Sequence, residues 1–142
     1  ALRQADFSMP VFGQANVGSP QLVQVAKEAA NGLTYVSPGP APADIEAEAF
    51  SEAYQALAGF RPGPRAVLTY DATNILLDAI GQAIAQKQAV PSRAKVSAVI
   101  RNIHRRGLSG DIAFDAQGQR LNAPVWVYQI FNAEYPGTMV VP

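Results

Sequence analysis

The sequence predicts an α/β fold, an open sheet with crossover helices and a C-terminal β-hairpin. The first observation is a strand–helix–strand order over residues 9–37, which is typical of an open parallel sheet. The second is helical periodicity between residues 42 and 106. The third is the stretch GDIAFDAQGQR, residues 110–120, in which apolar and polar residues alternate before Asp115 and Gly118 reverse the chain.

Length and composition indicate one globular domain. The chain has 142 residues, of which 49% are hydrophobic, so it can fill a core. Eleven basic residues balance eleven acidic ones, so we expect no nucleic-acid partner and no attraction to an anionic membrane. No stretch approaches the roughly 20 apolar residues of a membrane span, so we expect no direct membrane insertion. Because cysteine is absent, disulfides and thiolate sites are excluded. The absence of cysteine fits a periplasmic and a cytosolic protein equally.

The N-terminal segment is expected to form a parallel strand–helix–strand unit. Residues 1–8 look like the last turns of a helix, which leads into a short strand over residues 9–13. Ser19 is predicted to cap the next helix, with Pro20 at its first position, and a second strand follows over residues 33–37. Ligands of such sheets bind beyond the carboxyl ends of the strands, so the loop after the first strand is the first candidate site.

Proline-rich breaks separate three predicted helices in the middle of the chain. Residues 38–44 contain three prolines, which helix interiors and central strands exclude, so this stretch is a crossover. The helices are expected over Pro42–Gly59, residues 66–86 and Ser92–Arg106, the second with the clearest periodicity. The third should gather cations at its C-terminal end, where the helix dipole favours them: Arg101, His104, Arg105 and Arg106.

The stretch from residue 110 to residue 132 is expected to be a hairpin. Its second strand is PVWVYQIFN, residues 124–132, in which Trp126 is expected to serve packing. We assign Asp115 and Gly118 to turn geometry, because an Asx turn and a positive φ explain both residues without a ligand.

Taken in order, three segments resemble a known family. Residues 11–38, 49–83 and 107–132 look like the C-terminal portion of type I periplasmic binding proteins of the branched-chain amino-acid receptor group. These proteins are the extracytoplasmic ligand receptors of ABC transporters. The most specific element is the ordered set of an F-x-E-A-Y helix, a proline break, a Y-D-A helix start and the G-x-I-x-F-D-x-x-G hairpin.

The resemblance implies an architecture and a function. A member has two Rossmann-like lobes that hold a small polar solute, such as an amino acid, an amide or a small carboxylate, in the cleft between them. Residues 1–37 would belong to the second lobe, residues 38–109 to the crossover and mainly to the first lobe, and residues 110–142 would be the C-terminal strands. The resemblance implies that this chain is a C-terminal portion of such a protein. The apolar helix faces that it exposes would then contact a missing N-terminal portion or another chain.

The resemblance also implies a partner and a location. The lobes would close about a hinge, and the closed form would be presented to an ABC permease. The protein would be periplasmic, with its export signal outside this chain. The same scaffold serves ligand-sensing receptors and regulators, and the sequence does not separate transport from sensing.

The loop after the first strand lacks the acid with which amino-acid receptors of this family often meet the ligand's ammonium group. It has Gln14, Ala15 and Asn16 at the matching positions. A neutral loop leaves an ammonium group without an ionic partner, so we expect a carboxylate, amide, urea or aromatic acid to rival an α-amino acid as the ligand. Gln14 and Asn16 both offer hydrogen-bond donors and an acceptor. The alternative is an ordinary polar turn.

Two further residues are candidate ligand contacts. In the family the Y-D-A helix start faces the cleft, so Tyr70 could present its ring and hydroxyl to a ligand; the alternative is a core aromatic. Arg65 could clamp a carboxylate with its planar guanidinium, or it could be a solvated arginine. Asp71 is expected in the first turns of its helix, where a carboxylate suits the dipole.

An enzyme is the main alternative of another class. The sequence contains no G-x-S-x-G, H-E-x-x-H, P-loop or G-x-G-x-x-G motif. His104 stands among arginines without a neighbouring nucleophile motif. We therefore expect no catalytic residue, no metal and no cofactor, and an α/β hydrolase remains only as a third hypothesis.

Overall fold

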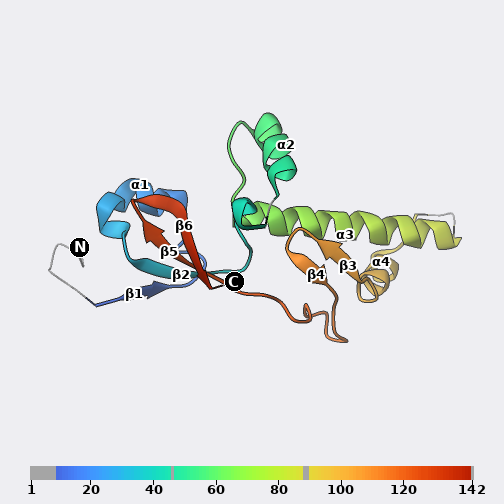
Figure 1. Cartoon of the computed structure of the whole chain (residues 1–142). Coiled ribbons are helices and arrows are strands. Elements are labelled where there is room, and N and C mark those ends of the chain that lie inside the picture. Colours follow the sequence, from blue (N-terminus) through green and yellow to red (C-terminus); the bar gives the residue numbers. More distant parts are fainter. Residues whose placement is uncertain (1–8, 46, 88–89, 142) are drawn as a thin grey trace.

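The computed structural model describes residues 9–45, 47–87 and 90–141, so the helix expected over residues 1–8 lies outside the described residues. The molecule is elongated, with a sheet at one end and helices at the other (Figure 1). The sheet has the order β1-β2-β5-β6, with β1 Val11–Gly13, β2 Leu33–Ser37, β5 Trp126–Phe131 and β6 Glu134–Val141. The predicted α/β class is confirmed.

The first three elements form the expected parallel unit. Between β1 and β2 lie helix α1 (Pro20–Ala26) and a short 3-10 turn, η2 (Lys27–Ala30). Ser19 caps α1 as predicted, because its Oγ accepts a hydrogen bond of 3.2 Å from the backbone N–H of Leu22. β1 and β2 then pair in parallel, with Val11 opposite Leu33.

Aromatic side chains form the core beneath this sheet. Tyr35 of β2 and Tyr128 of β5 are almost fully buried, and their rings stack with centroids 5.8 Å apart. Trp126 and Ile130 are buried in the same cluster, as the packing role predicted for Trp126 requires. Burial of side chains of this size stabilises the sheet by roughly 1.5–3 kcal/mol for each aliphatic or phenyl group.

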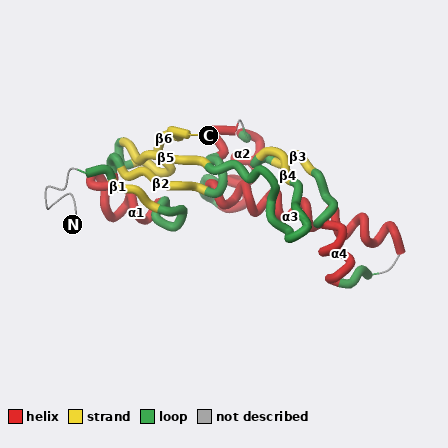
Figure 2. The backbone as a smooth tube through the Cα atoms, turned by 90° about the horizontal axis from the view of Figure 1, so that it is seen from below, coloured by secondary structure: helices red, strands yellow, loops and turns green. Residues whose placement is uncertain are grey.

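The segment between β2 and β5 leaves the sheet and carries most of the helices (Figures 1 and 2). Its helices are η3 (Pro42–Ile45), α2 (Glu48–Ala58), α3 (Pro64–Lys87) and α4 (Arg93–Ile100). α2 ends at Gly59 in the left-handed conformation, with φ of 78°, as the sequence predicts. Ile75 and Ala79 of α3 pack in a second core with Ile103 and Ile112. No helix among the described residues combines the length and hydropathy that crossing a membrane requires.

The predicted third helix is too long. Ser92 caps α4 as expected, but the helix ends at Ile100. Arg105 and Arg106 lie instead in β3 (Arg105–Gly107), which pairs antiparallel with β4 (Gly110–Ile112), so the two residues are not gathered at a helix terminus. The physical reason is tertiary: Ile103 is buried in the second core, and the β3–β4 turn is held by hydrogen bonds to α3.

The predicted hairpin over residues 110–132 is also wrong in its pairing. β4 pairs with β3, whereas β5 pairs with β2 and β6. The C-terminal β-hairpin is formed by β5 and β6, with Asn132 and Ala133 at positive φ in its turn. The local reversal at residues 114–120 does form.

The turn roles assigned in that reversal are confirmed. Phe114 bridges Arg120 in antiparallel fashion. Oδ1 of Asp115 accepts hydrogen bonds from the backbone N–H groups of Gln117 and Gln119, and Gly118 has φ of 83°.

Candidate ligand-binding site

A cavity of about 1100 Å³ lies between the sheet and the N-terminal half of α3. The loop after β1 contributes one wall, through Asn16, Gly18 and Ser19. α2, the segment at residues 60–63 and the first turns of α3 contribute the opposite wall, and residues 135–137 of β6 close one side. Its size exceeds the ~300–1000 Å³ typical of small-molecule sites.

The structure brings together three of the five predicted contact residues. Asn16, Arg65 and Tyr70 all line the cavity. Gln14 and Ala15 do not line it; the carbonyl of Gln14 instead accepts a hydrogen bond of 2.9 Å from the backbone N–H of Val17 and so closes the turn. Ligand contact by any of the five stays a prediction.

Four aromatic rings form one wall of the cavity. The rings of Phe50 and Tyr70 lie 5.1 Å apart, those of Phe50 and Tyr54 lie 5.9 Å apart, and those of Tyr54 and Phe60 lie 5.7 Å apart. Sequence reasoning named only Tyr70 of this set. The signal for Phe50 and Tyr54 was the F-x-E-A-Y motif, because these residues are four positions apart and therefore share one face of α2. Phe60 lies outside this motif.

Charged side chains of both signs line the same cavity, namely Asp44, Glu48, Glu52, Arg61 and Arg65. Sequence reasoning sought a carboxylate only in the loop after β1, where none exists. The carboxylates of the cavity come instead from η3 and α2. Their presence removes the ground for disfavouring an ammonium-bearing ligand on the loop composition alone.

Asp44 is tied to the sheet through Tyr128. The Tyr128 hydroxyl donates a hydrogen bond of 2.7 Å to Oδ2 of Asp44 and accepts one of 2.7 Å from the backbone N–H of Ala41. Burial raises the pKa of the Tyr128 hydroxyl well above its usual value, and the hydrogen bond to Asp44 raises it further. The contact fixes η3, and with it the start of α2, against the core of the sheet.

The β6 side of the cavity is fixed in a similar way. The Tyr35 hydroxyl donates a hydrogen bond of 2.9 Å to the carbonyl of Pro136. Burial raises the pKa of the neighbouring Tyr135, while the positive charge of Arg65 acts in the opposite direction. The positive charge of Arg65 therefore acts on Tyr135, which lines the cavity from β6.

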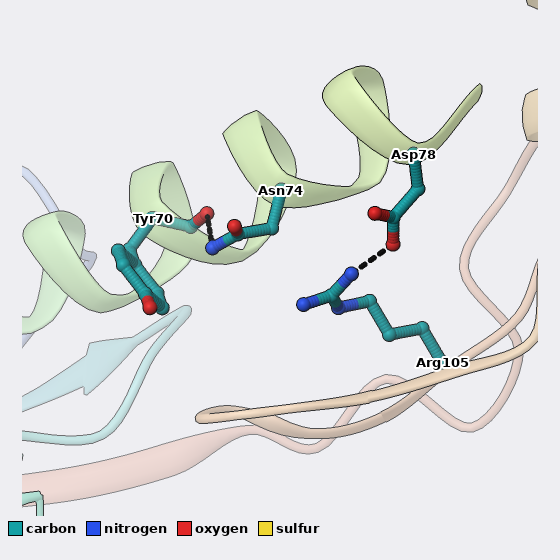
Figure 3. A network of polar contacts seen from close by, with 4 residues as sticks. All are labelled: Tyr70, Asn74, Asp78 and Arg105. Atoms are coloured by element: carbon teal, nitrogen blue, oxygen red, sulfur yellow. Dashed lines mark hydrogen bonds and ion pairs between the residues drawn. The ribbon is translucent and has the colours of Figure 1, made fainter. Parts of the chain in front are cut away.

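One face of α3 carries polar groups at intervals of four residues (Figure 3). Asn74 donates a hydrogen bond of 3.0 Å from its side-chain amide to the carbonyl of Tyr70, and Asp78 forms an ion pair with Arg105 of β3. Tyr70 is 47% exposed and lines the cavity, so it is not a core aromatic.

The role expected for Asp71 is wrong. α3 begins at Pro64, so Asp71 lies beyond the first turn and gains little from the helix dipole. Its carboxylate is buried and accepts hydrogen bonds from the backbone N–H groups of Leu108 and Ser109 and from the hydroxyl of Ser109. His104 is exposed, and within the described part of the chain no cluster of histidine, aspartate and glutamate could hold a metal ion.

The chain is similar to solved structures of solute receptors. It is 28% identical to the leucine-binding protein LivK of Thermotoga maritima, with a TM-score of 0.77 over 93% of this chain and 37% of that one. It is 22% identical to LivJ of Streptococcus pneumoniae, solved with isoleucine, with a TM-score of 0.77 over 99% of this chain and 39% of LivJ. A solute-binding protein of R. palustris, solved with benzoate, has 20% identity and a TM-score of 0.71 over 96% of this chain and 36% of its own length.

The chain therefore spans less than two fifths of the length of each of these three structures. No match was found among curated proteins. The family model of periplasmic binding proteins matches residues 1–134. This chain therefore belongs to the periplasmic binding protein family, whose fold its strands and helices share.

Proposed function

We propose that this chain is the C-terminal part of the two-lobed, extracytoplasmic solute-binding protein of an ABC transporter. The observation that carries the proposal is the position of the cavity, which lies between the sheet and the helical segment inserted between β2 and β5. In this proposal residues 9–37 and 126–141 belong to the second lobe, and the helical segment belongs mainly to the first. The chain does no chemistry on its ligand.

The proposed mechanism is closure of the two lobes around the solute. Asn16 belongs to one wall and Arg65 and Tyr70 to the other, so a solute that touches all three favours the arrangement in which the walls approach. A closed form stabilised in this way is the species that an ABC permease would recognise. The solutes of the structurally similar proteins, leucine, isoleucine and benzoate, support a small carboxylate-bearing ligand for this site.

The experiment is a thermal-shift screen of the complete two-lobed protein, whose C-terminal part this chain would be. The panel contains amino acids, amides and small carboxylates. A compound present at about a hundredfold excess over its own dissociation constant adds about 2.7 kcal/mol to the free energy of unfolding. We expect at least one member to raise the melting temperature. Failure of the whole panel would contradict the proposal.

Variants locate the site. Asn16→Ala and Arg65→Gln should weaken binding of the solute found in the screen, because both residues line the cavity. Arg93→Gln is the matched control, since Arg93 is exposed at the start of α4 and does not line the cavity. Unchanged affinity in both cavity variants would show that the solute binds elsewhere.

A further inference from the structure

The cavity carries chemistry that selects among small carboxylates. We propose that the solute has an aromatic ring as well as a carboxylate, the ring packing on the wall formed by Phe50, Tyr54, Phe60 and Tyr70 and the carboxylate meeting Arg65. This inference rests on the proposed function and names the class of its ligand.

The aromatic wall is continuous and incompletely covered. Its rings meet in sequence at interplanar angles of 56°, 52° and 74°, so each ring presents an edge or a face to the next. Tyr70 is 47% exposed at one end of the series and Phe60 is 62% exposed at the other, and both line the cavity. A further ring at the usual centroid separation of ~4.5–7 Å would extend the series and cover this apolar surface.

The wall is built from three separate segments. Phe50 and Tyr54 come from α2, Phe60 from the link after Gly59, and Tyr70 from α3. None of the residues of α2 is buried. The contact between the rings of Phe50 and Tyr70 is therefore a substantial part of the packing that holds α2 near α3. Occupation by an aromatic solute would therefore be coupled to the position of α2.

Arg65 supplies the charge for the carboxylate. It lines the cavity on the same helix as Tyr70, and its side chain is exposed. Within the described residues the ion pair is between Asp78 and Arg105, which leaves the guanidinium of Arg65 without a carboxylate partner. The planar fork of a guanidinium fits a carboxylate in two parallel hydrogen bonds.

Glu48 and Glu52 distinguish two classes of ligand that both have an aromatic ring and a carboxylate. Both line the cavity from α2, so a simple aromatic acid such as benzoate and an aromatic amino acid such as phenylalanine share the ring and the carboxylate, but only the second has an ammonium group for these glutamates. The experiment therefore includes both.

The test is isothermal titration calorimetry of the complete two-lobed protein with matched pairs of ligands. Benzoate is compared with cyclohexanecarboxylate, and phenylalanine with leucine, because each pair has the same charges and differs in the ring. We expect the aromatic member of at least one pair to bind about 2- to 10-fold more tightly than its partner, the range typical of one aromatic contact. If leucine and cyclohexanecarboxylate both bind as tightly as their aromatic counterparts, the inference is wrong while the proposed function stands.

Variants separate the wall from the general fold. Phe50→Leu and Tyr70→Leu should remove most of the aromatic preference, because they should weaken binding of the aromatic member of a pair more than binding of its non-aromatic partner. Leu57→Ala is the control, because Leu57 lies on α2, is 91% exposed and does not line the cavity. A preference that survives both ring variants would contradict the assignment of the wall, and absence of binding by all four ligands and by the wider panel would overturn the proposed function as well.

Discussion

Ser109 donates two hydrogen bonds to the same oxygen of Asp71, although 38 positions separate the residues. The backbone N–H lies 2.8 Å and the hydroxyl 2.6 Å from Oδ2, and Leu108 donates to Oδ1 at 2.8 Å. Asp71 and Ser109 are only 3% and 2% exposed. One carboxylate on α3 thus holds the turn between β3 and β4.

Removal of this carboxylate should destabilise the protein. Asp71→Ala leaves three donors of Leu108 and Ser109 without their acceptor in a largely buried site, so we expect a loss of about 2–4 kcal/mol in the free energy of unfolding. Urea denaturation measures it. Asp111→Asn, at an exposed side chain of β4, is the control and should change stability by less than about 0.5 kcal/mol. Equal effects of the two variants would show that the buried acceptor is not what stabilises the turn.

Gly107 and Gly81 should respond oppositely to alanine. A Cβ on Gly107 would lie 2.5 Å from the carboxylate carbon of Asp71, so Gly107→Ala must displace the turn and lower stability. A Cβ on Gly81, which is exposed in the C-terminal half of α3, would meet nothing within 4 Å, and Gly81→Ala should add about 0.5–1 kcal/mol through helix propensity. Thermal denaturation of both variants gives the signs. A stabilising Gly107→Ala would exclude the close approach of Asp71.

The Tyr128 hydroxyl should contribute to stability through two contacts. Tyr128→Phe loses the bond to Asp44 and leaves the backbone N–H of Ala41 unpaired, so we expect a loss of about 1–3 kcal/mol. Tyr54→Phe is the matched control, because the Tyr54 ring contributes to the cavity wall through ring contacts. A urea titration that gives both variants the same stability would place the contribution in the ring of Tyr128 and not in its hydroxyl.

Stability should fall at alkaline pH. Burial raises the pKa of Tyr35 and of Tyr128 above the value of about 10 that tyrosine has in an unfolded chain. Below about pH 10 both tyrosines are protonated in the folded and in the unfolded state, so their full contribution to the free energy of unfolding is present. Above about pH 10 the unfolded chain loses protons that the folded protein keeps, so the free energy of unfolding falls as the pH rises.

The expected slope is about 1.4 kcal/mol per pH unit for each tyrosine that stays protonated, beginning near pH 10. Urea denaturation at intervals between pH 8 and pH 11 measures it. Tyr35→Phe should reduce the slope above pH 10 relative to the parent protein. A slope that the substitution does not change would show that Tyr35 ionises alike in both states.

Local signals allowed much of the fold to be predicted. Ser19, Ser92 and Gly59 mark helix ends through their own backbone chemistry, and all three have the expected roles. β3 escaped prediction because Arg105 and Arg106 suit a helix end, while the acceptor that holds the following turn, Asp71, lies more than thirty positions away. Such long-range contacts override local preference.

β6 was missed for a different reason. Pro136 and Gly137 have the chemistry of a turn, yet they lie within the strand. A Cβ on Gly137 would lie 2.2 Å from the carbonyl oxygen of Gln129, so the glycine permits β5 to approach closely. A glycine inside a strand often has this meaning, but only the pairing partner reveals it.

The candidate site was predicted in part. Asn16, Arg65 and Tyr70 were found from loop position, charge and motif, and they line one cavity. Phe50 and Phe60 were not predicted to line the site, because the sequence pattern indicates only a separate helix at α2 and a proline break after it. The contact of Phe50 with Tyr70 and that of Phe60 with Tyr54 arise from the way the chain folds back between α2 and α3.

The order of strands in the main sheet makes one body out of two distant parts of the chain. Gln129 of β5 donates a hydrogen bond to Thr34 of β2, a residue 95 positions earlier in the chain. A protease that cuts once after the exposed Phe60, between α2 and α3, would place β1 and β2 on one polypeptide and β5 and β6 on another. The two products would still share a backbone ladder, so a nicked molecule should migrate as a single species until a denaturant separates its halves.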